Sequence, residues 1–262
     1  DQDALLASDS EQWYTQLKRL IEHADLRERI GKNAKQRILN EYNTNHLATQ
    51  LTLLLTQALY AGRHQQMDYR PKIAIVNVFF PPQSIGGATR VVADQVDILQ
   101  AKYHQHLDLV IFTSDHCPSN TPYVTELYNY QGSRVYRLSV IHREHMEWYG
   151  NDHRVAAIFA EFLALEQPDL VHFHCIQRLT GSIVDVCLRA NIPYVVTVHD
   201  AWWISHYQFL IDPNNVLYLG GHPDPYVPCP PPRGIDFNTA IHRSYYLKEL
   251  LNQARVVLHV SA

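Results

Sequence analysis

The first residues of this chain that could do chemistry are two glycines in the loop that follows a long apolar run. Gly86 and Gly87 follow the run at 73–80, which is rich in β-branched and aromatic residues and predicts a buried strand. Glycine lacks a Cβ, so a ligand can approach the backbone closely there. Three apolar residues then recur at helical spacing: Val92, Val96 and Leu99. They predict a helix whose free N–H groups attract anions. The pattern is that of a phosphate-facing site, although the same order of elements opens many α/β domains whose loop only turns the chain.

Histidine is abundant, with 16 residues in the chain. The close pairs His172/His174 and His142/His145 have a spacing at which metal ligands could lie, and the first pair would share one face of a strand. No Asp, Glu or Cys cluster at ligand spacing accompanies them, so no metal site is expected. The four cysteines are widely spaced and form no CxxC pair: Cys117, Cys175, Cys187 and Cys229. This spacing predicts reduced thiols and a cytoplasmic protein.

Composition narrows the class of protein. The chain has 262 residues, of which 46% are hydrophobic and 18% charged, as is typical of a soluble globular protein with one sizeable core and a smaller unit. The net charge is −4 and no Lys/Arg cluster stands out, so nucleic acid is not an expected partner. The N-terminal segment DQDALLASDS has neither the basic start nor the apolar centre of a signal peptide. It also lacks an initiator Met, which predicts that the chain is a fragment.

The chain changes character along its length. Residues 1–62 show helical patterns only, residues 63–70 form a polar linker, and residues 71–262 alternate between strands and helices. Within the helical segment, Ser8 and Glu11 have the spacing of a capping box, and Asp25 with Glu28 repeats that start signal. A third amphipathic helix is expected over residues 47–58.

The longer part predicts an α/β fold with a doubly wound, mostly parallel Rossmann-like sheet. Six apolar runs predict its strands: 73–80, 107–113, 135–138, 169–174, 194–199 and 256–260. Helical patterns separate several of them: 155–163, 183–190 and 245–254. Ligands in such sheets bind beyond the carboxyl ends of the strands, which selects three segments as site candidates: 81–89, 174–180 and 199–205. The Pro/Gly-rich stretch at 212–234 can be neither helix nor central strand, and it is either a binding loop or a disordered excursion.

Three strings occur in one order along the chain: IGGATR, DLVHFHCI and YVVTVHDAWWIS. Together they resemble the N-terminal Rossmann-like domain of a family 4 (group 1) retaining glycosyltransferase of the GT-B fold. The family pattern is a Gly-Gly pair after the first strand, a strand ending in Asp-x-x-His-x-His, and a strand ending in His-Asp followed by an aromatic residue. The matching residues here are Gly86, Gly87, Asp169, His172, His174, His199, Asp200 and Trp202. The His-Asp-x-Trp form, with the later Cys229-Pro230 pair, resembles the branch that builds cell-surface polysaccharides.

A second resemblance concerns the helical segment. The run LKRLIEHADLRERIGKNAKQRILNEYN is similar to the closing helices of a glycosyltransferase donor domain. The end of one transferase is thus followed by the start of another. This order implies a piece of a tandem, two-transferase polypeptide.

The family resemblance implies a role for each matched residue. Gly86 and Gly87 let backbone N–H groups approach the diphosphate of a nucleotide-sugar donor, and His199, as the catalytic residue, hydrogen-bonds the donor sugar. Three further residues shape the cleft or contact the acceptor, a glycan or lipid-linked saccharide: His174, Asp200 and Trp202. For the histidines and the tryptophan the structural alternative is that they only satisfy backbone groups or fill the core.

The resemblance also implies what is missing. The family's donor-domain carboxylates and basic residues would follow Ala262, so a C-terminal donor domain is absent and this fragment alone is expected to be inactive. No cofactor is implied, because family members are usually metal-independent. A lipid-linked acceptor implies peripheral contact with the inner face of the cytoplasmic membrane. Two alternatives stay open: a GT-B-like sugar-nucleotide epimerase, and a degenerate transferase domain that only docks an active neighbour.

Overall fold

The computed structural model describes most of the chain in two units. The described residues are 3–41, 50–51, 53–55, 69–83, 85–117, 119–212, 215–217 and 230–260. By their internal contacts the residues divide into two compact units, Asp1–Leu53 and Leu54–Ala262. Most of the predicted linker at 63–70 lies outside the described residues, so that linker stays a prediction.

Residues 3–41 of the first unit form the helices α1 (Ser10–Glu22) and α2 (Ala24–Glu41). Helix α1 starts one residue later than the Ser8 and Glu11 spacing predicts. Its N-cap is Asp9, whose carboxylate accepts a hydrogen bond from the Gln12 backbone N–H at 2.8 Å. A carboxylate caps the free N–H groups as well as a serine does, so the two candidates differ only in register. Of the third predicted helix, residues 50–51 and 53–55 are described and helical.

The second unit is built on a seven-stranded sheet with the order β3-β4-β2-β1-β5-β6-β7. The strands are β1 (Lys72–Asn77), β2 (Asp108–Ser114), β3 (Thr125–Tyr130), β4 (Ser133–Leu138), β5 (Leu170–Phe173), β6 (Tyr194–Val198) and β7 (Val256–His259). All neighbouring strands are parallel except the β3–β4 pair. The predicted mostly parallel α/β sheet is therefore confirmed, with β3 as an antiparallel edge strand that the apolar runs did not predict.

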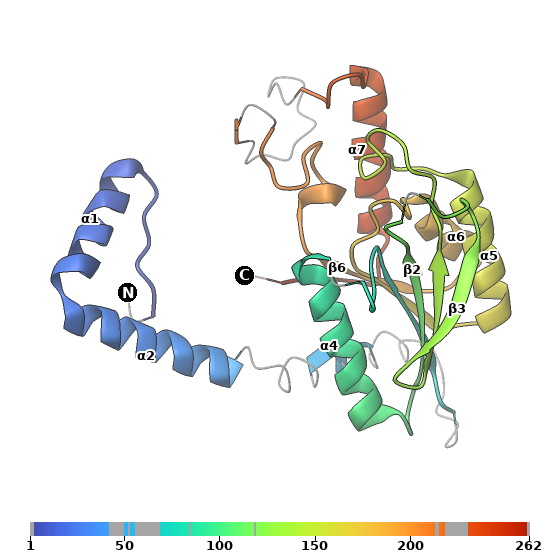
Figure 1. Cartoon of the computed structure of the whole chain (residues 1–262), viewed down its shortest axis with the longest axis horizontal. Helices are drawn as coiled ribbons and strands as arrows, with labels where there is room; N and C mark the ends of the chain where they lie inside the picture. The colour runs from blue at the N-terminus through green and yellow to red at the C-terminus, as the bar shows by residue number, and fades with distance from the viewer. Residues whose placement is uncertain are drawn as a thin grey trace. The chain divides into compact units, whose positions relative to one another are not determined.

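Helices cover both faces of this sheet (Figure 1). They are α4 (Gly86–Tyr103), α5 (His153–Glu166), α6 (Ser182–Arg189) and α7 (Phe237–Asn252), with a short 3₁₀ helix η1 (Ala201–Trp203). Helices α5, α6 and α7 share one core cluster with alternate residues of the central strands. Helix α4 leads from β1 to β2 and lies on the other face, where Val92, Val96 and Leu99 are buried.

Strand register decides which side chains reach which face. Val76 is paired with Phe112 and with Phe173, and all three belong to the α5–α7 core, where Phe112 packs edge-on against Phe159 with ring centroids 5.0 Å apart. Full burial of one such side chain stabilises the fold by about 1.5–3 kcal/mol. His172 is the residue before Phe173 in β5, so its side chain points to the opposite face of the sheet.

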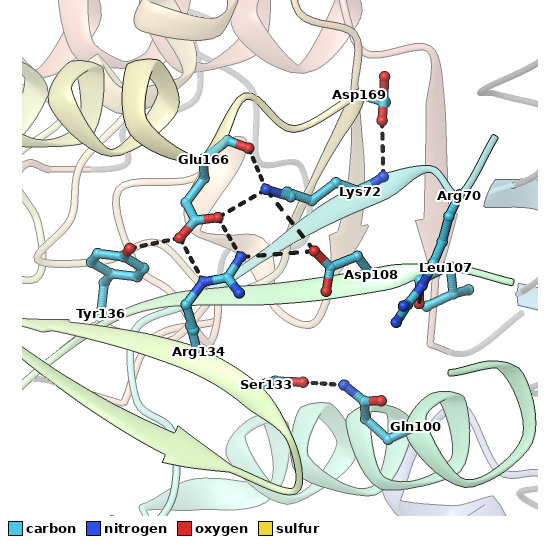
Figure 2. A network of polar contacts seen from close by, with 10 residues as sticks. All are labelled: Arg70, Lys72, Gln100, Leu107, Asp108, Ser133, Arg134, Tyr136, Glu166 and Asp169. Atoms are coloured by element: carbon cyan, nitrogen blue, oxygen red, sulfur yellow. Dashed lines mark hydrogen bonds and ion pairs between the residues drawn. The ribbon is translucent and has the colours of Figure 1, made fainter. Parts of the chain in front are cut away.

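A charged network lies at the opposite end of the strands from the predicted site (Figure 2). Glu166, whose side chain is 5% exposed, accepts hydrogen bonds from both Arg134 Nε at 2.8 Å and Arg134 Nη2 at 2.6 Å. Tyr136 and Lys72 also donate to its carboxylate, at 2.6 and 3.1 Å. The network joins the end of α5 to the starts of β1 and β4.

The chain reverses direction across the sheet at β1. From β1 it moves to β2 on one side, and after β4 it returns to β5 on the other side. Loops that leave the carboxyl ends of β1 and β5 therefore run apart. In open α/β sheets this is where a ligand crevice forms.

Candidate functional site

A buried asparagine ties together the two loops that diverge at the carboxyl edge of the sheet. Asn77, the last residue of β1, is fully buried, and its Oδ1 accepts a hydrogen bond from the Cys175 backbone N–H at 3.0 Å. Its Nδ2 donates to the Phe79 carbonyl at 2.6 Å, and the Val78 N–H donates to the Cys175 carbonyl at 2.6 Å. Sequence analysis did not select Asn77, although a lone amide inside an apolar strand was the available signal.

The predicted glycine pair opens α4 rather than lying within a long loop. Gly86 is the first helical residue and has a positive φ of 77°, a conformation that favours glycine. The N-cap residue Ile85 has no side chain that could bond the first-turn N–H groups. These donors are therefore open to an anion. A Cβ added at Gly86 or Gly87 would meet nothing within 4 Å, so there is space beside both residues.

A pocket lies beside the first two turns of α4. Its volume is about 520 Å³, and its lining residues are Pro81, Gln83, Gly86, Thr89, Arg90 and Ala93. The exposed Arg90 forms no ion pair with any described residue, so its charge is available. Among the predicted site residues only Gly86 lines this pocket.

The predicted histidines form a chain that runs from the core toward the sheet edge. His172 Nε2 is 2.8 Å from the Thr197 hydroxyl, and His174 Nδ1 is 3.0 Å from His199 Nε2. The ring centroids of His172 and His174 are 4.1 Å apart. Both of these side chains are fully buried, whereas His199 is partly exposed at the end of β6. The structure therefore brings His174 and His199 together, as two neighbouring strand ends should.

These three imidazoles are held neutral. Burial lowers the pKa of His172 to about 3 and the pKa of His174 well below its ordinary value. Burial also lowers the pKa of His199, although the neighbouring Asp200 carboxylate raises it in part. A neutral imidazole offers one N–H donor and one lone pair. The group can therefore bind a hydroxyl as donor or as acceptor, depending on its tautomer.

Asp200 acts as an anchor for the loop after β6. Its Oδ1 accepts a hydrogen bond from the Trp202 backbone N–H at 2.9 Å and so caps η1. Its Oδ2 accepts from the side-chain amides of Gln177 at 3.0 Å and Gln208 at 2.7 Å. The carboxylate therefore fixes the segment that follows His199. A contact between Asp200 and an acceptor stays a prediction.

Trp202 packs inside the protein. Its side chain is 2% exposed, and its indole N–H donates to the Glu147 carbonyl at 2.6 Å. The Arg243 guanidinium lies over its ring, 5.0 Å from the centroid. These contacts support a packing role, and the predicted contact with a sugar stays untested.

Arg243 of α7 is a buried cation that the sequence patterns did not indicate. It is 6% exposed, lies between the rings of Trp148 and Trp202, and donates to the carbonyls of Trp148, Ser205 and Trp202. Burial lowers its pKa to about 9, so it remains charged at neutral pH. Its fork of N–H donors holds α7 to the η1 segment. No local sequence pattern could reveal this, because the partners come from two segments that are distant from α7 in the sequence, one at Trp148 and one at 202–205.

The described part of the chain contains no group of three or more His, Cys, Asp or Glu residues that could hold a metal ion. His145, one member of the second histidine pair, contacts the Arg233 carbonyl at 2.9 Å. None of the described helices is both long and apolar enough to cross a membrane.

Comparison with known families identifies the family of this chain. A family model described as glycosyl transferase 4-like domain matches residues 86–261, which span the glycine pair, the histidine chain and the η1 segment. The chain belongs to this family of glycosyl transferases. A second model, described as glycosyl transferase-like, matches residues 1–52. The two resemblances predicted for this glycosyl transferase chain are thus confirmed at the level of the family. No curated protein sequence matches it.

Several solved structures are similar to part of this glycosyl transferase chain. The UDP-forming α,α-trehalose-phosphate synthase of Burkholderia vietnamiensis is 13% identical, with a TM-score of 0.42 over 74% of this chain and 40% of that protein. The sucrose-phosphate synthase of Thermosynechococcus elongatus is 17% identical, with a TM-score of 0.34 over 50% of this chain and 34% of that protein. The catalytic domain of starch synthase IV of Arabidopsis thaliana is 16% identical, with a TM-score of 0.34 and the same coverage. The chain spans 34 to 40% of the length of these proteins.

Proposed function

We propose that residues 71–262 form the acceptor-side domain of a retaining GT-B glycosyltransferase. The reaction is transfer of a sugar from a nucleotide-sugar to a glycan or lipid-linked saccharide during surface polysaccharide biosynthesis. The donor-binding domain is supplied by another segment of the polypeptide, and a lipid-linked acceptor brings the protein to the inner face of the cytoplasmic membrane. The observation that carries the proposal is the family match over residues 86–261.

The start of α4 supports binding of the diphosphate leaving group. Transfer from a nucleotide-sugar leaves negative charge on the diphosphate, and fixed donors aimed at that charge lower the barrier. The N-cap residue Ile85 gives the first-turn N–H groups of α4 no side-chain hydrogen bond, and Arg90 lines the same pocket as Gly86. Gly86 and Gly87 leave the space that a diphosphate needs to reach these donors.

The histidine chain supports binding of the transferred sugar. His199 lies at the end of β6, partly exposed, and its ring is fixed by His174 at 3.0 Å. A fixed imidazole can orient a sugar hydroxyl and so bring the anomeric carbon into line with the acceptor. We assign no nucleophile, because the Asp200 carboxylate already accepts three hydrogen bonds from the surrounding loop.

The test measures the release of free nucleoside diphosphate from a panel of UDP-, GDP- and ADP-sugars, with glycan and lipid-linked acceptors added. It uses a polypeptide that contains both this chain and its donor domain, as wild type and as the Gly87→Val and His199→Ala variants. We expect one donor to be turned over and each variant to lose about 10²-fold in rate, because each removes or blocks a contact in the transition state. The Gly31→Ala variant is the control: Gly31 lies in α2, distant in sequence from the predicted site residues, and this variant should keep full activity.

The other outcomes identify the alternatives. Interconversion of a free nucleotide-sugar without any acceptor would identify an epimerase, which moves protons rather than glycosyl groups. Absence of turnover with every donor and acceptor would favour a docking domain that has lost catalysis. Full activity of both variants would place the transferase site elsewhere in the polypeptide.

A further inference from the structure

We propose that His174 is a positioning residue that locks His199 in the tautomer with its proton on Nδ1. His199 then presents an N–H donor, and not a base, to whatever occupies the carboxyl edge of the sheet. The identity of that ligand as a sugar rests on the proposed function, whereas the tautomer itself does not.

The shared hydrogen bond limits the choice to two arrangements. His174 Nδ1 and His199 Nε2 are 3.0 Å apart, and burial keeps both imidazoles neutral. Two neutral rings can share only one proton along this line, so one nitrogen donates and the other accepts. Either His174 carries its proton on Nδ1 and donates to His199, or it carries its proton on Nε2 and accepts from His199.

The far side of the His174 ring decides between them. His174 Nε2 is buried and has no hydrogen-bond partner. A proton there would create a buried N–H without an acceptor, which is rarer and more costly in proteins than an unused lone pair. The adjacent His172 supplies no acceptor: its ring is tilted by 39° against that of His174, its Nε2 is bonded to Thr197, and its Nδ1, although unpaired, makes no hydrogen bond to His174. The proton of His174 therefore belongs on Nδ1, from which it donates to His199.

The consequence falls on the outer nitrogen of His199. Its Nε2 accepts from His174, so the neutral ring must carry its proton on Nδ1. This Nδ1 has no partner among the described residues and is not one of the buried polar atoms left unpaired. It is the nitrogen that can reach a ligand. A hydroxyl or phosphate oxygen would accept from it, and the lone pair that a general base needs is already occupied by His174.

The experiment is NMR spectroscopy of the imidazole nitrogens in the chain labelled with ¹⁵N-histidine, near neutral pH and without any ligand. The signals of His199 are assigned by their loss in His199→Gln. We expect His199 Nδ1 to be protonated and its Nε2 to be unprotonated. In His174→Leu the lock is removed, and the two His199 tautomers should mix. His174→Asn keeps an N–H donor near the position of Nδ1 and should restore the single tautomer.

The matched control is Thr197→Val, which removes the partner of His172 on the same buried face but leaves the His174–His199 contact intact. It should leave the His199 signals unchanged. A proton on Nε2 of His199 in the wild-type chain would overturn the proposal, and this measurement needs no folded variant other than His199→Gln, which serves for the assignment. An unchanged His199 in folded His174→Leu would overturn it as well.

Activity gives a second, independent readout. Where turnover is found, His174→Leu should lower it by about 10²-fold and His174→Asn should largely restore it. A purely structural role would not predict rescue by a donor amide. If no donor is turned over, the transferase proposal fails but the tautomer measurement still decides the role of His174.

Discussion

At the scale of single residues, the neighbours Gly86 and Gly87 differ in how well the fold tolerates a side chain at their positions. Gly86 has a φ of 77°, whereas Gly87 has no such conformation, and both have open space at the Cβ position. A side chain at Gly87 is therefore tolerated by the fold and obstructs only a ligand. A side chain at Gly86 is strained even without a ligand, at a cost of about 1–2 kcal/mol.

The prediction is that Gly87→Ala leaves the free energy of unfolding within about 0.5 kcal/mol of wild type, while Gly86→Ala lowers it by about 1 kcal/mol. Urea denaturation followed by tryptophan fluorescence measures both. Both variants should weaken donor binding, since both add a methyl group beside the first-turn N–H groups of α4. A Gly87→Ala chain that unfolds earlier but binds the donor normally would show that this glycine serves only the turn.

The positions of individual residues were predictable where they depended on strand ends. Gly86, His174 and His199 follow apolar runs, and parallel strands bring such ends to one edge of the sheet. The hydrogen bond between His174 and His199 could not be predicted in this way, because it depends on the register of β5 against β6, which no local sequence pattern contains. Burial of Trp202 was equally hidden, because Arg243 and Glu147 reach it from distant segments.

At the scale of elements, the Glu166 network makes the stability of the contact between α5 and the sheet depend on pH. The hydrogen bonds from Arg134, helped by those from Tyr136 and Lys72, lower the pKa of Glu166 to about 2 from an ordinary value of 4.5, against the opposing effect of burial. Because the pKa is lower in the folded state, the stabilisation is complete above pH 4.5 and is lost as the pH falls through about 2. It amounts to at most about 3 kcal/mol, and the solvent exposure of Arg134 reduces it.

We predict that Glu166→Gln flattens the dependence of stability on pH between about 4.5 and 2 and lowers the free energy of unfolding at pH 7 by about 1–3 kcal/mol. Thermal unfolding at a series of pH values measures this. Glu161→Gln is the matched control, since Glu161 lies on the same helix and is exposed. Parallel pH profiles for wild type and Glu166→Gln would mean that the network contributes nothing to acid stability.

The elements that sequence analysis missed have a common physical cause. Strand β3 has no buried residue, so it lacks the apolar run or alternation that marks a strand. It forms because β4 offers an unpaired edge with a short turn at Gln131 and Gly132, both at positive φ. Helix α7 begins at Phe237, eight residues before the predicted start, in a polar stretch that Asp236 caps through its side chain. The buried, locally patterned elements were predictable, and those completed by tertiary pairing or by a cap were not.

At the scale of the whole molecule, the two compact units differ in how much buried hydrophobic core they contain. Helix α1 contains no buried residue, and several of its large apolar side chains are exposed: Trp13, Tyr14, Leu17 and Ile21. The main core cluster draws all of its members from the second unit. Helices of this length without a buried face are marginal on their own in water. The second unit therefore holds nearly all of the cooperative stability.

The prediction is that removal of residues 1–53 shifts the midpoint of thermal unfolding of the remaining chain by less than about 5 °C. A peptide of residues 1–53 alone should show weak helicity in far-UV circular dichroism and no cooperative transition, because it has too little core to offset its chain entropy. Leu55→Ala is the positive control, since Leu55 is 2% exposed and belongs to the retained unit, and it should cost about 2–5 kcal/mol. A drop of more than about 10 °C on removal of residues 1–53 would mean that this segment is part of the core of the glycosyl transferase domain and not a separate unit.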